Sequence, residues 1–446
     1  VILKFAESDK SGESSNSIVR QMSQLFSLHL SGTQAPPSRR RAFVQKLLES
    51  GSQRHREIAG ELFHAAFEAM HWTSFSMFDF GARRRDSGWH PRTRAEELDW
   101  YIGFLNLLRP VLASDDSTLR EWARSLLAGH FRGLWTFAGC FDDLEEIVRS
   151  HATGCSWPKM WMAIKQTLSF DSDGAYPELR ARLEGLERFT APSDPYSEIE
   201  AYVLASTWDH VESMGGLDTA GVDPLETKIA SLGKMAATEP SYLERLGPRL
   251  WEGEFDALYP FGIGLAQGSA DVMATFEHLL HLVQRQAPAV LYPLVLLGYI
   301  NAANGMDPGL ARAMQERILD HPLLRSHFIY LLGASKVTPW GIKKLIELAR
   351  GGEFEPWRFR QLAYGRMHKS VPDGELSELL AILNKLDNGI YTTLDILESR
   401  FFVGKDSNYV PSEVLLSVGR EAIRNLLSGE REQIELDRIR GTKHIV

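Results

Sequence analysis

Two segments of this chain carry the same sequence pattern, 64 residues apart (112 − 48). The first, LESGSQRHREIAGELFHAAF, runs from Leu48 to Phe67, and the second, LASDDSTLREWARSLLAGHF, from Leu112 to Phe131. Similarity at a fixed offset is the signature of a repeat architecture, whose units bury their apolar faces by stacking on one another. A stack of this kind presents a surface, so recognition becomes the first functional hypothesis and catalysis the second. Seven of the twenty aligned positions are identical, namely Leu48/Leu112, Ser50/Ser114, Arg56/Arg120, Glu57/Glu121, Ala59/Ala123, Leu62/Leu126 and Phe67/Phe131.

Apolar residues follow a helical period through most of the chain. In the first copy they recur three and four residues apart, which gives one apolar stripe on an amphipathic helix. The second copy has the same stripe, and segments with the alternation of a strand are hard to find. We therefore predict an all-α chain.

Several polar residues mark expected helix starts. Ser38 follows two prolines, and a cluster of polar residues spans 114–117; both supply side-chain acceptors for exposed helical amides. Thr93, with Glu96 three residues later, has the spacing of a capping box.

A second repetition is marked by proline. Pro308, Pro339 and Pro372 each open an amphipathic segment, and they are 31 and 33 residues apart (339 − 308 and 372 − 339). Proline suits the first turn of a helix because the amide that it lacks has no partner there. The three prolines therefore predict three helix-turn-helix units.

Together these patterns predict a right-handed α-solenoid of HEAT-like or TPR-like helix pairs. We divide the sequence into five parts. They are an N-terminal segment with a lead-in helix (1–37), a first helical-repeat block with an inserted arginine-rich loop (38–135), a middle helical region (136–260), a second helical-repeat block (261–387) and a C-terminal helical cap (388–446).

Composition fits a soluble protein with a sizeable core, since 44% of residues are apolar and 24% are charged. The one notable apolar run, Ala287 to Ile300, contains two prolines and is too short to span a bilayer, so we expect no membrane segment. The chain opens without a secretory signal and does not begin with methionine, and we treat it as a segment that can belong to a larger protein. Two cysteines, Cys140 and Cys155, are too few for a disulfide framework and favour a reducing cytoplasm.

Charge is unevenly distributed. The chain carries −9, which argues against a general nucleic-acid binder. Residues 38–94 hold eleven Lys and Arg against six Asp and Glu, a local +5, so the remainder carries −14 (−9 − 5). This basic region leaves nucleic acid open as a second class of partner.

Motifs that carry chemistry are lacking in the sequence. The fragment Gly404-Lys405-Asp406 lacks the first glycine and the hydroxyl of a phosphate-binding loop. Cys140, His151 and Cys155 supply at most three zinc ligands where a structural site needs four, and buried thiols are the simpler interpretation. Neither an HExxH pattern nor a nucleophile elbow is present. We predict no catalytic residue, no cofactor and no metal.

The loop from Gly81 to Pro91, between the two copies, is the most unusual local sequence. Its arginines and aromatic ring offer planar donors and a stacking face to a partner's carboxylates, phosphates or bases. The alternative is structural: one arginine pairs with the aspartate, another packs on the tryptophan, and the loop only ties two repeats together. The candidate partner-binding residues are Arg83, Arg84, Arg85, Asp86, Trp89 and His90.

Two groups of residues carry a resemblance to a known family. The first is Phe80-Gly81-Ala82-Arg83 with Arg85-Asp86, Gly88-Trp89 and Pro91, and the second is the run Arg360 to Arg366, RQLAYGR. With these residues the chain resembles the C-terminal helical regions of large bacterial signal-transducing NTPases of the STAND and NACHT type and of related multidomain defence proteins. The resemblance implies a trigger-sensing array that follows a separate NTPase module and an effector. Neither module lies in these residues, and no binding residue is carried over.

Our main hypothesis is therefore a non-enzymatic scaffold that recognises a macromolecule, with a protein as the expected partner. It would be the sensor part of a larger bacterial signalling or defence protein. A second hypothesis is a nucleic-acid-binding HEAT-like scaffold or DNA-repair glycosylase that uses the basic region 38–94. A third is an unrecognised hydrolase, for which a cluster of titratable side chains in a cleft would be the sign. The sequence leaves the oligomeric state open.

Overall fold

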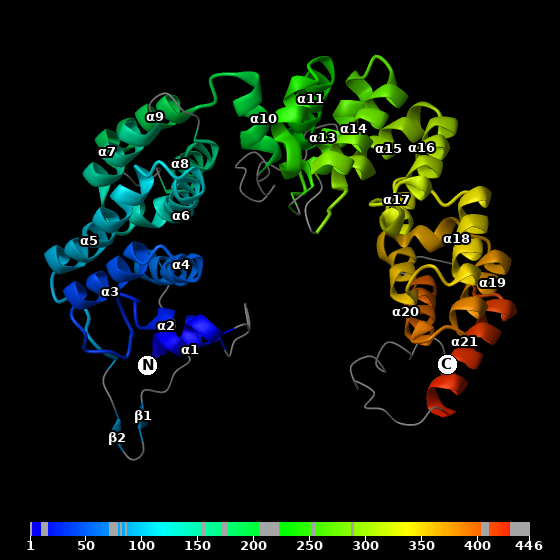
Figure 1. The fold of residues 1–446 in the computed structure, drawn as a ribbon, viewed down its shortest axis with the longest axis horizontal. Coiled ribbons are helices and arrows are strands. Elements are labelled where there is room, and N and C mark those ends of the chain that lie inside the picture. The colour runs from blue at the N-terminus through cyan, green and yellow to red at the C-terminus, as the bar shows by residue number, and fades with distance from the viewer. Residues whose placement is uncertain are drawn as a thin grey trace. The chain divides into compact units, whose positions relative to one another are not determined.

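The computed structural model describes residues 2–9, 17–70, 79–80, 83–84, 87–152, 157–171, 176–204, 223–251, 253, 255–286, 290–402 and 410–428. These residues are helical almost throughout (Figure 1), as the sequence predicted. The exception is one pair of two-residue strands, β1 (Asp79–Phe80) and β2 (Arg83–Arg84), which the sequence did not predict. No helix in the described part of the chain is both long and apolar enough to cross a bilayer.

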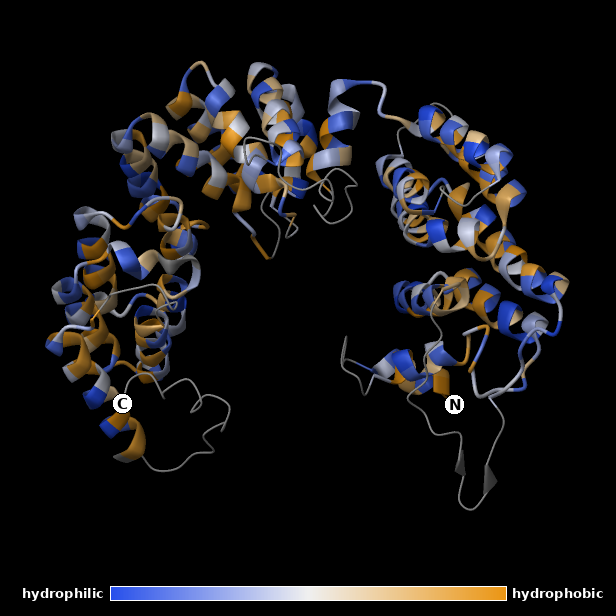
Figure 2. Ribbon diagram, turned by 180° about the vertical axis from the view of Figure 1, so that it is seen from behind, coloured by the Kyte–Doolittle hydropathy of each residue, from blue (hydrophilic) through white to orange (hydrophobic). Residues whose placement is uncertain are grey.

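The chain divides into two compact units, Val1–Gly221 and Val222–Val446. The division falls inside the region 136–260 that the sequence grouped as one middle block. Each unit has its own buried core. Apolar residues, orange in Figure 2, alternate with polar ones along the helices, as amphipathic helices require.

The first unit packs its helices in two rows. Helices α2, α4, α6, α8 and α10 contact one another in succession, and α3, α5, α7 and α9 do the same. Consecutive helices such as α3 and α4, or α5 and α6, join the rows. The helices are α1 (Ile2–Ser8), α2 (Ile18–Gln24), α3 (Pro37–Glu49), α4 (Gln53–Phe67), α5 (Arg94–Leu112), α6 (Ser117–Thr136), α7 (Phe141–Ala152), α8 (Pro158–Asp171), α9 (Pro177–Thr190) and α10 (Pro195–Val203).

The two copies of the repeated sequence fold alike. Each copy contains the end of one helix, a turn and the next helix, so it covers α3 to α4 and α5 to α6. The shared apolar positions are buried, except that Leu48 is only partly buried, and Phe67 and Phe131 are fully buried. The shared arginines bond to their own turns: Arg56 donates to the Gly51 carbonyl at 3.1 Å and Arg120 to the Ser114 carbonyl at 2.7 Å. Apart from the exposed pair Glu57/Glu121, the identical residues are therefore those that build the turn and the core.

Helix starts agree in part with the sequence prediction. Thr93 caps α5, with its side chain accepting from the Glu96 amide at 3.2 Å. The prediction for Ser38 was wrong, because α3 begins at Pro37 and has no side-chain cap. In the polar cluster the cap is Asp116, which accepts from two amides of α6.

The second unit also has rows of successive helices. In one row α11, α13, α15, α17, η5 and α20 contact each other in order; in the other, α14 contacts α16, and α18 contacts α19. Pro308 and Pro339 are the first residues of α16 and α18, as predicted, whereas Pro372 is the residue before α19. The elements are α11 (Pro224–Thr238), α12 (Ser241–Leu246), η3 (Gly247–Leu250), α13 (Leu258–Gly268), α14 (Val272–Gln286), α15 (Leu294–Met306), α16 (Pro308–Asp320), η4 (Arg325–His327), α17 (Phe328–Leu332), α18 (Pro339–Gly351), η5 (Pro356–Leu362), η6 (Tyr364–Ser370), α19 (Asp373–Leu383), α20 (Gly389–Phe401) and α21 (Glu413–Ser428), where η marks a 3-10 helix.

Glycines bring three helices of this unit unusually close. A Cβ at Gly262 of α13 would lie 2.1 Å from the Val295 carbonyl of α15, and one at Gly264 would lie 1.9 Å from the Ala230 carbonyl of α11. Backbone therefore meets backbone on both sides of α13, which only glycine permits.

Candidate functional site

The predicted arginine loop is described only in part. Arg83 and Arg84 form strand β2 and pair antiparallel with Phe80 and Asp79. The side chains of both arginines, and all of Arg85 and Asp86, lie outside the described residues. Their partner-binding role stays a prediction.

The end of the loop is fastened to an earlier segment by its backbone. The Gly32 amide donates to the Ser87 carbonyl at 2.9 Å, and the Trp89 amide donates to the Thr33 carbonyl at 2.8 Å. Gly88 has a φ of 89°, and a Cβ there would lie 2.6 Å from the Thr33 nitrogen. Only glycine fits where the two segments cross.

Trp89 is half-buried and packs on a buried arginine. Its ring stacks on that of Trp100, with centroids 5.9 Å apart, and the Arg40 guanidinium lies 5.1 Å from the Trp100 centroid and 5.8 Å from that of Trp89. Arg40 is 2% exposed and donates to the carbonyls of Ala35, Ser27 and Thr33 and to the Ser31 hydroxyl. Burial lowers the pKa of Arg40 to about 10. The arginine beside Trp89 is therefore Arg40 of α3, outside the loop, and the described residues do not test the pairing of the loop's own arginines. His90 is exposed, and its Nδ1 lies 3.2 Å from the Gly88 carbonyl oxygen.

The basic region 38–94 engages most of its described arginines in contacts within the fold. Arg41 pairs with Asp99 at 3.0 Å, Arg54 with Glu57 at 3.1 Å, and Arg94 with Glu97 at 2.9 Å. Arg56 lies 3.7 Å from Asp116, which links the turns of the two repeat copies. A count of charges along the sequence therefore overstates the positive surface of this region.

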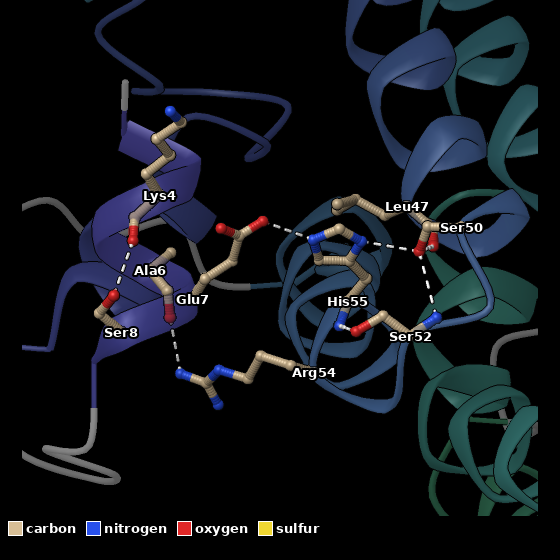
Figure 3. A network of polar contacts seen from close by, with 9 residues as sticks. All are labelled: Lys4, Ala6, Glu7, Ser8, Leu47, Ser50, Ser52, Arg54 and His55. Carbon is tan, nitrogen blue, oxygen red and sulfur yellow. Dashed lines mark hydrogen bonds and ion pairs between the residues drawn. The ribbon is translucent and has the colours of Figure 1, made fainter.

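A serine, a histidine and a glutamate meet near the N-terminus in the order of a charge relay (Figure 3). Ser50 Oγ lies 2.7 Å from His55 Nδ1, and His55 Nε2 lies 2.6 Å from Glu7 Oε1. Ser50 also donates to the Leu47 carbonyl at 2.7 Å, so its proton is already committed. Its counterpart in the second copy, Ser114, makes a similar turn contact with no histidine beside it. We therefore interpret Ser50 as part of the turn rather than as a nucleophile, and His55 as a link that holds α1 to the turn.

A second serine–histidine pair joins a buried histidine to a partly buried serine. His368 is 0% exposed and its Nε2 lies 2.9 Å from Ser399 Oγ, which donates to the Ala363 carbonyl at 3.0 Å. The Ser399 proton is used by the Ala363 carbonyl and the histidine is fully buried, so this pair does not support the hydrolase hypothesis.

Metal ligands do not gather in the described part of the chain, where no group of three or more His, Cys, Asp or Glu could hold an ion. Of the sequence's three candidate ligands, Cys140 is buried without a disulfide, His151 lies in α7, and Cys155 lies outside the described residues. Burial raises the pKa of the Cys140 thiol to about 12, which keeps it neutral and unreactive.

A concave site with aromatic and charged walls lies in the second unit, among residues that the sequence did not single out as a binding site. A pocket of about 480 Å³ is formed by the residues before α15, by η4 and α17, and by η5. This volume is in the range of small-molecule and side-chain pockets. Its lining includes the aromatic residues Tyr292, Tyr330 and Trp357 and the polar residues Asp256, Ser326, His327, Arg358 and Gln361.

Arg358 and Trp357 dominate one wall of this pocket. The Arg358 guanidinium stands 4.8 Å from the Trp357 centroid and donates to the Ser326 carbonyl at 2.9 Å. Trp357 is nevertheless 57% exposed, which is a large apolar area to leave in water. The only hint in the sequence was the Trp-Arg pair after Pro356, close to the run Arg360 to Arg366.

His327 forms part of the pocket wall opposite Trp357 and Arg358. Its Nε2 lies 3.1 Å from the Leu291 carbonyl oxygen, which only accepts, so Nε2 carries the proton and donates. Burial, helped by the nearby Arg358 charge, lowers the pKa of His327. Around neutral pH the ring is therefore uncharged, and Arg358 is the pocket's cation.

No known protein family, curated protein or solved structure matches this chain. The residues that line the pocket are therefore the basis for a functional proposal.

Proposed function

We propose that the chain is a right-handed α-solenoid of HEAT-like or TPR-like helix pairs and that it recognises a protein partner. The packing within each unit supports the architecture, because helices α2 to α10 of the first unit and the row α11, α13, α15 and α17 of the second contact the next helix but one along the chain, as stacked pairs do.

The observation that carries the recognition hypothesis is the pocket beside Trp357 and Arg358. Tryptophan and arginine are the residues most enriched among binding hot spots, and here they lie together at a concave surface. The pocket crosses successive helices of one row, which is where helical-repeat proteins offer their binding surfaces.

We further propose that this chain is the sensing part of a larger bacterial signalling or defence protein in the cytoplasm. The support is the resemblance to STAND-type and NACHT-type helical regions carried by the residues around Arg83 and by the run Arg360 to Arg366. Nucleic acid is the less favoured partner, because Arg40, Arg41, Arg54, Arg56 and Arg94 are engaged within the fold.

Affinity capture from the native cell, followed by mass spectrometry, tests the proposal. We expect one dominant protein partner with the unaltered chain and a loss of most of that partner with Trp357→Ala. Charge reversal at Arg83, Arg84 and Arg85 tests whether the loop adds a second contact. Recovery of nucleic acid alone, with a steep dependence on salt, would contradict the proposal.

A further inference from the structure

We infer that the pocket beside Trp357 binds a carboxylate carried next to an aromatic ring on the partner protein. The inference rests on the proposed function and specifies the chemistry of the partner.

Within the part of the chain that the structure describes, Arg358 differs from most arginines of the second unit because it has no carboxylate partner. Eight described arginines of the second unit pair with Asp or Glu: Arg285, Arg312, Arg317, Arg325, Arg350, Arg360, Arg400 and Arg420. Among the described residues no carboxylate pairs with Arg358, whose one hydrogen bond goes to the neutral Ser326 carbonyl. The guanidinium has further donors, and a fork of two parallel N–H groups matches a carboxylate.

The aromatic wall holds this arginine in place and supplies the second half of the site. Stacking on Trp357 and the bond to Ser326 fix the guanidinium from two sides, so little side-chain entropy remains to be lost on binding. Tyr292, Tyr330 and the exposed Trp357 ring line the same pocket. A ring next to the bound carboxylate would cover this apolar surface and remove it from water.

The charges of the pocket favour a single negative charge over a polyanion. Among the described residues that line it, Arg358 is the one arginine or lysine, and burial and the Arg358 charge keep His327 neutral. Asp256 also lines the pocket and repels further negative charge. These features fit a carboxylate and disfavour a phosphate dianion or a nucleic-acid backbone.

The test compares two probes of almost equal shape on the full chain. N-acetyltryptophan carries an indole and a carboxylate, and N-acetyltryptophanamide replaces the carboxylate by a neutral amide. With saturation-transfer NMR titrations we expect the acid to bind at least about tenfold more tightly than the amide, because a charge-assisted bidentate bond is lost in the amide. The preference should disappear in Arg358→Gln and remain in Arg424→Gln, which alters an exposed arginine of the same unit that does not line the pocket.

A second arm separates the two possible sources of the carboxylate. A blocked peptide with one internal glutamate next to one tryptophan presents a side-chain carboxylate, and N-acetyltryptophan resembles a chain end. Whichever binds more tightly identifies the source, provided that Trp357→Ala weakens it. Trp357 is exposed enough to be replaced without unfolding the chain.

Several outcomes would overturn the inference. They are equal binding of acid and amide, unchanged binding in Arg358→Gln, or binding of inorganic phosphate as tight as that of N-acetyltryptophan. Capture of a protein partner that ignores the Arg358 and Trp357 variants would overturn the inference and leave the proposed function intact. Selective carboxylate binding with no protein partner in the cell would instead contradict the proposed function.

Discussion

Three consecutive arginines show how much a residue's role depends on its place on the helix. Arg39 is exposed, Arg40 is buried among backbone acceptors, and Arg41 pairs with Asp99. Neighbouring residues of a helix point about 100° apart, so three identical neighbours meet three different surroundings. The sequence shows the charges, but which of them faces the core depends on the segment 27–35 and on Trp89 and Trp100, which only the fold brings to Arg40.

Two histidines on stacked helices allow a prediction about pH. His64 Nδ1 of α4 lies 2.8 Å from His130 Nε2 of α6, so one ring donates and the other accepts. Burial, and then His64 itself, lower the pKa of His130 to about 4. Burial also lowers the pKa of His64, while the negative charges of Glu61 and Glu68 act in the opposite direction on His64 and His130 respectively.

Acid lowers the stability of the folded state through this pair, because the unfolded state takes up protons at a higher pH. An unfolded histidine has a pKa near 6.5, so between that pH and about 4 the unfolded state binds more protons than the folded state. The contribution of the neutral His130 ring to the free energy of unfolding is complete above pH 6.5 and is lost as the pH falls toward 4. We expect the unaltered protein to lose about 1 to 3 kcal/mol more than His130→Gln on acidification through this window.

Thermal unfolding of both proteins at a series of pH values measures this difference. His281→Gln, at an exposed position of the second unit, is the control and should follow the unaltered protein. Parallel curves for the unaltered protein and His130→Gln would show that the pair contributes nothing to acid sensitivity.

At the scale of elements, periodicity and repetition were sufficient to predict the helices. The amphipathic helix predicted in each copy of the repeat corresponds to α4 and α6, and the copies also include the turns that join these helices to α3 and α5. The pocket in the second unit could not be predicted in this way. Its walls come from the residues before α15, from α17 and from η5, which lie roughly thirty residues apart in sequence and meet only because successive helices of a row stack.

The contact of α13 with α11 leads to a prediction about packing. A Cβ at Gly264 would lie 1.9 Å from the Ala230 carbonyl and 2.7 Å from its Cα, so the two backbones must separate to admit a methyl group. We expect Gly264→Ala to destabilise the second unit by about 2 to 4 kcal/mol, at or above the usual cost of overpacking.

The matched control is Gly305→Ala in α15, where an added Cβ would meet nothing within 4 Å. It should be neutral or stabilising by up to about 1 kcal/mol, since alanine favours the helix. Denaturant unfolding, followed by circular dichroism, measures both. Equal stability of the two variants would mean that the close approach of α11 and α13 is wrong.

At the scale of the whole molecule, the chain combines two self-contained packing systems. In the first unit one continuous set of buried apolar residues extends from Ala6 to Leu186, and in the second the glycine-packed helices and the pocket use residues from 223 onward. Each unit has the length of an ordinary domain. The sequence showed no long linker between them, so its five-part division could not locate this boundary.

The two-unit organisation predicts that fragments 1–221 and 222–446 each fold when expressed alone. Their summed circular dichroism should reproduce the spectrum of the full chain, each should unfold cooperatively, and the second should retain carboxylate binding.

A cut after Gly139 is the contrasting control, because it divides the stacked pairs α5·α7 and α6·α8 and exposes their buried faces. In a stack, stability comes largely from contacts between neighbouring repeats, so fragments cut there should melt at lower temperature than the intact first unit. If fragment 222–446 is unfolded, or the cut after Gly139 costs no more stability than the cut after Gly221, the two units are not independent and the pocket depends on the whole chain.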